Sequence, residues 1–168
     1  MNKLIIPGLI VLVVLIVLMQ WLFTIDQTEV AIVTRFGEPK RVLIDPGLKI
    51  KTPFIDRVTR FDKRLLRYDA IPADLLTKDK KTLHIDAYAR YRIIDPLLFY
   101  QTVKDEQGAN RRVGDLVDSA LREEIAQDNQ VDIIKTEREA IMKRVLAISS
   151  EKALSFGIEI VDIRTKRI

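Results

Sequence analysis

The feature that most constrains this chain is an uncharged, apolar run near its N-terminus, from Leu4 to Ile25, between Lys3 and Asp26. A helix of that length would be roughly 33 Å long, which is enough to cross a hydrocarbon core of about 30 Å. The run has no polar face, and a helix that is apolar all round is buried in protein or in lipid. We therefore expect residues 1–25 to form a single transmembrane anchor.

Two other interpretations of this run are weaker. A signal peptide has an apolar core of about 7–15 residues followed by small residues at the cleavage site, whereas residues 19–23 read Met-Gln-Trp-Leu-Phe. A buried helix of a soluble core is seldom so long and so uniformly apolar. Under the anchor interpretation, the side chains expected in the bilayer or at its edge are Leu4, Ile10, Leu15, Trp21 and Phe23.

The remaining residues, 26–168, have the size of one compact domain with a core of its own. The net charge of the chain is +4, from 28 Lys and Arg against 24 Asp and Glu, and both signs are mixed along the sequence. This distribution indicates no strongly charged partner and disfavours nucleic-acid binding. The chain has no cysteine, which excludes disulfides, thiolate metal sites and cysteine nucleophiles.

Residues 26–70 are expected to form a β-rich first part. The segment Gln27–Phe36 is apolar on both faces, which predicts an interior strand, and Asp45-Pro46-Gly47 is a strong turn signal. Leu48–Lys51 alternates apolar and cationic residues, the pattern of a half-buried strand. Two alternatives stay open for Phe54 and Ile55: packing in the small β core, or contact with the membrane surface together with Leu48.

Residues 71–168 are expected to form an α/β second part, and its clearest element is a hairpin. Leu75–Ile94 contains a polar turn at Lys78–Lys81, and the second arm alternates apolar and polar residues from Leu83 to Ile93. Asp95-Pro96 then predicts the start of a helix, with Asp as N-cap and Pro in the first turn.

Two longer helices and a strand are expected after a break at Gly108-Ala109-Asn110. An apolar stripe predicts a helix over Arg111–Gln127 with Glu123 and Glu124 facing water, and Val131–Ile134 reads as a short link. Thr136 and Glu139 form a capping box for the next helix, which ends near Gly157. The last strand, Ile158–Ile163, is apolar on both faces and is expected to be central. The whole domain is therefore expected to be α+β.

The sequence predicts no catalytic, cofactor-binding or metal site. The single histidine, His84, is expected on the outward face of a strand near Asp86, and no Gly-x-Ser-x-Gly motif surrounds any serine that could serve with it. There is no His-Glu-x-x-His motif and no phosphate-binding glycine loop. A membrane-bound hydrolase is therefore a disfavoured alternative. The serines considered for it are Ser119, Ser149, Ser150 and Ser155.

Three segments in the correct order resemble the SPFH or Band 7 family, which includes stomatins, prohibitins and flotillins. They are Glu29–Gly37 directly after the anchor, Pro46–Asp56 continuing to Asp62-Lys63-Arg64, and Gly157–Arg164. Within the family, the stretch from Leu76 to Pro96 is most similar to the bacterial protease-modulator branch. The resemblance covers essentially the whole chain and implies a Band 7 domain over residues 26–168.

The resemblance also implies a function. Members of that branch are not enzymes but scaffold subunits that form a cage with a sister SPFH protein around a membrane AAA+ protease. They are anchored in the bacterial inner membrane with a cytoplasmic N-terminus and a periplasmic domain. An alternative within the family is a stomatin-like, lipid-ordering scaffold with no protease partner. Such proteins continue into a long helical coiled coil, which is absent from this 168-residue sequence.

Overall fold

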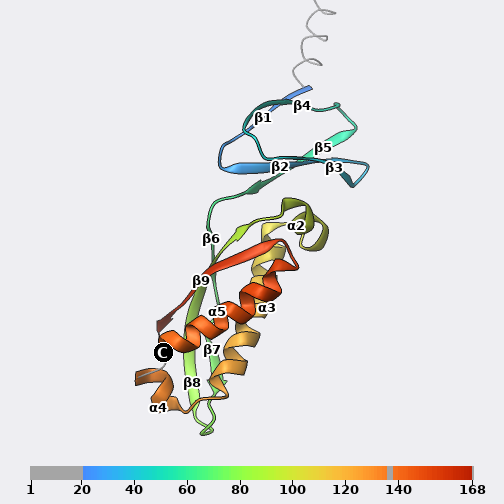
Figure 1. Ribbon diagram of the computed structural model, residues 1–168. Coiled ribbons are helices and arrows are strands. Elements are labelled where there is room, and N and C mark those ends of the chain that lie inside the picture. Colours follow the sequence, from blue (N-terminus) through green and yellow to red (C-terminus); the bar gives the residue numbers. More distant parts are fainter. Residues whose placement is uncertain (1–20, 136–137, 168) are drawn as a thin grey trace, which may run out of the picture. The chain divides into compact units, whose positions relative to one another are not determined.

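The computed structural model describes residues 21–135 and 138–167 (Figure 1). The chain divides into two compact units, Met1–Asp62 and Lys63–Ile168. The division comes earlier than the expected boundary at residue 70. The reason is that the strand β6 (Leu66–Asp69) pairs with a strand of the second unit.

In its described residues, 21–62, the first unit has five short strands arranged as two small sheets. In one sheet β2 lies between β3 and β5, which confirms the expectation of an interior strand, and in the other β1 pairs with β4; all pairings are antiparallel. The buried side chains Phe23, Ile25, Ala31 and Val33 form its core cluster. The strands are β1 (Leu22–Ile25), β2 (Glu29–Arg35), β3 (Glu38–Leu43), β4 (Gly47–Ile50) and β5 (Asp56–Asp62).

The C-terminal end of the apolar run is a strand, so the expected single helix over Leu4 to Ile25 is wrong at this end. Leu22–Ile25 forms β1, whose alternating pattern turns Phe23 and Ile25 into the core. Pairing with β4 satisfies the backbone of these residues, and the core accepts their side chains, so Phe23 lies in the core of the domain, not in a bilayer helix. The anchor residues Leu4, Ile10 and Leu15 lie outside the described residues. Among the residues that are described, no helix has the length and apolarity needed to span a bilayer.

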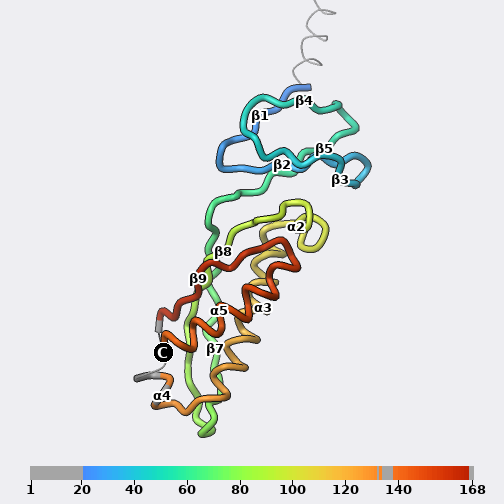
Figure 2. The backbone as a smooth tube through the Cα atoms, in the orientation of Figure 1, coloured from blue at the N-terminus to red at the C-terminus, as the bar shows by residue number. Residues whose placement is uncertain are grey.

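The second unit is organised around the long strand β8 (Thr82–Ile93), which pairs antiparallel with β6, β7 and β9. The two longest described helices, α3 and α5, pack against each other, and α5 also packs against β9 (Figures 1 and 2). The remaining elements are β6 (Leu66–Asp69), β7 (Ala73–Leu76), α2 (Pro96–Thr102), α3 (Glu106–Ile125), α4 (Gln130–Lys135), α5 (Arg138–Leu154) and β9 (Ile158–Arg167).

Several local expectations are confirmed in this unit. β7 and β8 form the expected hairpin, and the apolar row of β8 from Leu83 to Ile93 is buried. The Asp95 side chain accepts hydrogen bonds from the backbone N–H groups of Leu97 and Leu98, as an N-cap does. Gly157 has φ +71°, the left-handed conformation expected after the helix.

Four expectations about this unit are wrong. Helix α3 runs through the expected break, since Asp105 caps it and binds the N–H of Gly108. The segment expected as a link, 131–134, is part of helix α4. Strand β9 pairs with β8 alone among the described strands, so it is an edge strand. Glu124 is buried because Arg144 of α5 binds it.

Candidate functional site

The first unit exposes an apolar face on the ribbon formed by β1 and β4. Leu22 lies opposite Ile50, and Thr24 lies opposite Leu48. Residues directly opposite one another in an antiparallel pair share a face. Because Phe23 and Ile25 take the core side, these four side chains point to water, and the exposed fractions of Leu22, Leu48 and Ile50 are 46%, 65% and 60%.

The turn between β4 and β5 carries a second exposed apolar group. Phe54 is 89% exposed and Ile55 is 43% exposed. The interpretation that Phe54 and Ile55 pack in the β core is therefore wrong. The physical reason is that the core side is already filled by alternate residues of β1 and β2. Phe54 also has φ +66°, a backbone conformation that bulky residues rarely adopt.

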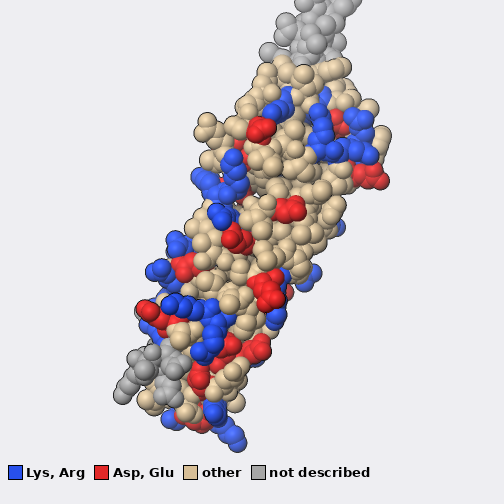
Figure 3. Space-filling model, in the orientation of Figure 1, with Lys and Arg blue, Asp and Glu red and all other residues tan. Residues whose placement is uncertain are grey.

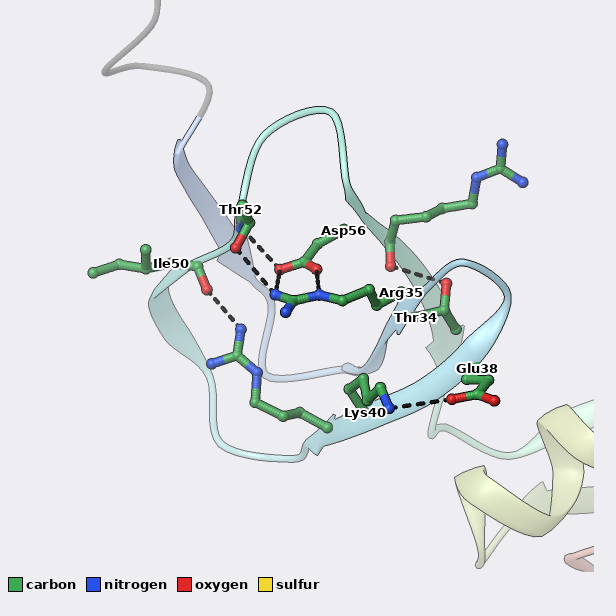
Figure 4. Close-up of polar contacts among 9 residues, drawn as sticks. Thr34, Arg35, Glu38, Lys40, Ile50, Thr52 and Asp56 are labelled. Carbon is green, nitrogen blue, oxygen red and sulfur yellow. Dashed lines mark hydrogen bonds and ion pairs between the residues drawn. The ribbon is translucent and has the colours of Figure 1, made fainter.

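A buried carboxylate closes this turn and ties it to the end of β2 (Figure 4). The Asp56 side chain is only 2% exposed and accepts from Arg35 Nε at 2.8 Å. Its second oxygen accepts from the backbone N–H of Thr52 at 2.9 Å, and Arg35 also donates to the Thr52 hydroxyl. The Arg35 guanidinium and the Thr52 N–H hold the pKa of the Asp56 carboxyl well below its usual range.

Trp21 connects this region to the apolar run that precedes it in the sequence. The Trp21 carbonyl accepts a hydrogen bond of 2.9 Å from the backbone N–H of Lys51, and the Trp21 side chain is 44% exposed. The end of β4 is thus fixed to the residue that follows the uncharged segment 4–20. The position of Trp21 beside polar backbone and half in water is compatible with an interfacial anchor.

The only histidine lies on the exposed face of β8, as expected, and its Nδ1 is 2.8 Å from Asp74 Oδ1 of β7. The Ser149 and Ser155 hydroxyls donate to backbone carbonyls of helices, so neither is paired with His84. Within residues 21–135 and 138–167 no group of three or more His, Asp or Glu side chains is arranged to hold a metal ion.

The outward face of β8 and its neighbours carries cross-strand ion pairs. Lys166 of β9 lies 2.7 Å from Asp69 of β6 and 3.3 Å from Asp86 of β8. Acidic and basic side chains are interspersed on the face drawn in Figure 3. The sequence alone did not reveal these partners, because they come from three separate strands. Two further pairs join β8 to β9: Arg90 with Asp162, and Arg92 with Glu159.

A second ion-pair cluster joins the two longest described helices. Arg144 of α5 binds both Glu124 and Asp128, and the Glu124 side chain is only 7% exposed. Charged groups buried in this way are stable only when paired. The cluster therefore helps to fix the packing of α5 on α3.

Comparison with known proteins assigns a family to this arrangement. Residues 23–168 match the SPFH domain / Band 7 family. The chain is 33% identical to HflC of Treponema pallidum over 72% of this chain and 37% of that protein. It is 32% identical to HflC of Vibrio parahaemolyticus over 100% of this chain and 63% of that protein. HflK of Haemophilus influenzae is 27% identical over 84% of this chain and 34% of that protein.

The chain thus spans between 37% and 63% of the length of these HflC proteins. Apart from Leu22, the first residue of β1, the family match includes all of the described strands and the helices α2–α5. Together with the described strands and helices, it confirms the α+β fold class. This chain belongs to the SPFH domain / Band 7 family.

Proposed function

We propose that this chain is a membrane-anchored scaffold subunit that assembles with a sister, HflK-like SPFH protein and modulates a membrane AAA+ protease of the FtsH type. The observation that carries the proposal is the similarity of the whole chain to proteins named HflC, together with similarity to a protein named HflK. Chains of one fold that are anchored in one plane meet at a high effective concentration, which favours side-by-side assembly.

The anchor in this proposal is the apolar run before β1, with Leu4, Ile10 and Leu15 in the bilayer and Trp21 at its edge. Phe23 is not part of it, because its side chain is buried in the first unit. The membrane is the bacterial inner membrane, with the N-terminus in the cytoplasm and the domain in the periplasm. Leu48, Phe54 and Ile55 are proposed to touch the lipid surface, which their exposure supports.

The topology is testable because the chain has no cysteine. Ser119 is exposed on α3, so a Ser119→Cys variant offers one thiol in the second unit. With the outer membrane permeabilised and the inner membrane intact, a membrane-impermeant maleimide should label it before lysis. Labelling that requires lysis of the inner membrane would refute a periplasmic domain.

The partners are tested by isolating the tagged full chain from a detergent extract and identifying the proteins that come with it. A sister SPFH protein together with a AAA+ protease supports the proposal. An SPFH protein without a protease would favour the stomatin-like, lipid-ordering alternative. Neither partner, from an extract in which the chain is folded and abundant, would refute the scaffold proposal.

The variant His84→Ala distinguishes the scaffold function from the disfavoured hydrolase function. His84 is exposed and its imidazole pairs with Asp74 at the surface, so His84→Ala should leave both partners bound in the same amount. If the purified chain hydrolysed a peptide and His84→Ala abolished that activity, the chain would be a hydrolase.

A further inference from the structure

Like the β4–β5 turn at Phe54, the β2–β3 turn holds a phenylalanine in a backbone conformation with positive φ. Arg35 pairs with Glu38 across a two-residue loop, Phe36-Gly37, in which φ is +51° and +89°. Positive φ at both positions is the pattern of a type I′ hairpin turn, whose first position favours Asn, Asp or Gly. A phenylalanine is strained there, and the Phe36 side chain is 89% exposed. Packing of the ring in the core therefore does not explain why a phenylalanine occupies this turn position.

The strand register brings the two turns to the same end of the β2–β5 pair. Arg35 and Asp56 are the last partners of that pair. Phe36 follows Arg35 directly, and Phe54 precedes Asp56 by two residues. Each of the two exposed phenylalanines is thus within two residues of one member of the Arg35–Asp56 ion pair drawn in Figure 4.

The ion pair and its hydrogen bonds constrain both turns at once. Asp56 binds the backbone N–H of Thr52, and the N–H of Asp56 donates to the Thr52 carbonyl at 3.0 Å, which closes the turn around Phe54. Arg35, which enters the Phe36 turn, binds the same carboxylate through Nε and Nη2. Strained backbone at an exposed position persists only where surrounding contacts over-determine it.

We propose that Arg35, Asp56 and Thr52 form a clamp that holds Phe36 and Phe54 as one preformed apolar tip for insertion into the lipid surface. This inference rests on the proposed function of Phe54 as a surface contact and adds Phe36 and the clamp to it. The lipid surface is the occupant that the chain itself favours. Lys51, next to the clamp, is hydrogen-bonded to Trp21, directly after the uncharged run.

A rigid tip suits a bilayer for an energetic reason. Aromatic side chains at an interface bury their rings at the level of the headgroups and acyl chains. A turn that is already closed loses little further conformational freedom when it inserts. The clamp itself stays outside the apolar layer, because the Arg35 side chain is 45% exposed and keeps its water.

The contact is tested with the full chain in nanodiscs of phosphatidylethanolamine and phosphatidylglycerol. Single cysteines are introduced as Phe36→Cys and Phe54→Cys and labelled with the fluorophore NBD. Gln27→Cys is the control, since it is exposed and lies at the opposite end of β2, before Glu29. Doxyl-labelled lipid should quench the emission at positions 36 and 54, because both labels would lie at the boundary of headgroups and acyl chains, and it should leave position 27 unchanged.

The clamp is tested by adding Asp56→Asn to both labelled variants. Asn keeps the size of the side chain but removes the charge that Arg35 binds, so quenching should fall at both positions together. Glu38→Gln is the matched control, because Glu38 lies beside the Phe36 turn and pairs with Lys40 rather than with the clamp. It should leave both signals unchanged. Hydrogen exchange of β2 reports whether each variant keeps its fold.

Each other outcome overturns a defined part of the inference. Quenching at position 54 but not at 36 would exclude the two-phenylalanine tip and leave the Phe54 contact intact. Quenching that Asp56→Asn does not change would exclude the clamp. If Asp56→Asn unfolds the unit, Arg35→Lys makes the same test, because lysine keeps a cation beside Asp56 but cannot reproduce the contacts that Arg35 makes through Nε and Nη2. Quenching at neither position would remove the lipid contact, while the co-isolation of partner proteins would still decide the scaffold function.

Discussion

Replacing Gly157 by alanine should destabilise the second unit more than an ordinary surface change. Gly157 has φ +71°, where an L residue with a Cβ is strained by roughly 1–2 kcal/mol. A Cβ at this position would lie 2.4 Å from the Asp95 carbonyl oxygen and 2.9 Å from the Phe99 nitrogen. Both are backbone atoms, so neither can rotate away, and the start of α2 must move.

That movement breaks contacts which join β9 to the end of β8. The Gly157 carbonyl accepts from the backbone N–H groups of Ile94 and Asp95, at 3.0 Å and 3.2 Å. Each such bond contributes about 1 kcal/mol net. With the backbone strain, we expect the free energy of unfolding of the second unit to fall by about 3 kcal/mol. A typical domain has about 5–15 kcal/mol in total.

Hydrogen exchange of the full chain, followed by mass spectrometry, measures this loss unit by unit. A fall of about 3 kcal/mol corresponds to roughly 150-fold faster exchange of the protected amides of α3 and β8, while those of β2 keep their rates. Gly37→Ala is the matched control, since Gly37 has φ +89° but no atom within 4 Å of a built Cβ. It should accelerate exchange only in the first unit. An effect of Gly157→Ala on α3 no larger than that of Gly37→Ala on β2 would refute the steric reasoning.

Three further predictions concern the second unit. Arg144→Met leaves the buried carboxylate of Glu124 without this cation and should lower the free energy of unfolding by about 2 kcal/mol. Adding Glu124→Gln should recover part of that loss. If the double variant loses as much stability as Arg144→Met, the Arg144–Glu124 ion pair is not the source of the stability. Tyr91→Phe removes the hydroxyl that donates to Asn110 at 2.9 Å and should cost about 1 kcal/mol, measured by urea denaturation; no change would mean that water replaces the bond. The Thr77 hydroxyl and Lys81 lower the pKa of Asp79 to about 2, against about 3.9 in the unfolded chain. The stability that Asp79 contributes is therefore complete above the unfolded pKa and is lost as the pH falls through the folded pKa. Asp79→Asn should accordingly weaken the pH dependence of the urea midpoint between pH about 5 and about 2.

The sequence predicted best those elements whose signals are local. The alternation along β8, the cap at Asp95 and the glycine after α5 each depend on residues within a few positions of one another. The period of a strand and the unpaired N–H groups of a helix start are properties of the backbone itself. These parts were therefore predicted correctly without knowledge of distant partners.

The sequence failed where a distant partner changed the meaning of a local pattern. Leu22–Ile25 continues an apolar run, and only pairing with β4 makes it a strand with Phe23 in a core. Glu124 looks like a surface residue until Arg144 of another helix is placed beside it. Phe36 could have been noticed from the sequence, since an aromatic residue before Gly37 in a short turn is unusual.

By itself, the sequence determined the apolar N-terminal run, the α+β pattern and the resemblance that family matching confirmed. Only the tertiary structure decided where the apolar run gives way to a strand, which phenylalanines are exposed, and that Arg35 and Asp56 meet between two turns. The physical reason is that hydrophobic patterning and capping act along the chain. Strand pairing and buried ion pairs join residues that are far apart in sequence, and their geometry exists only in the folded domain.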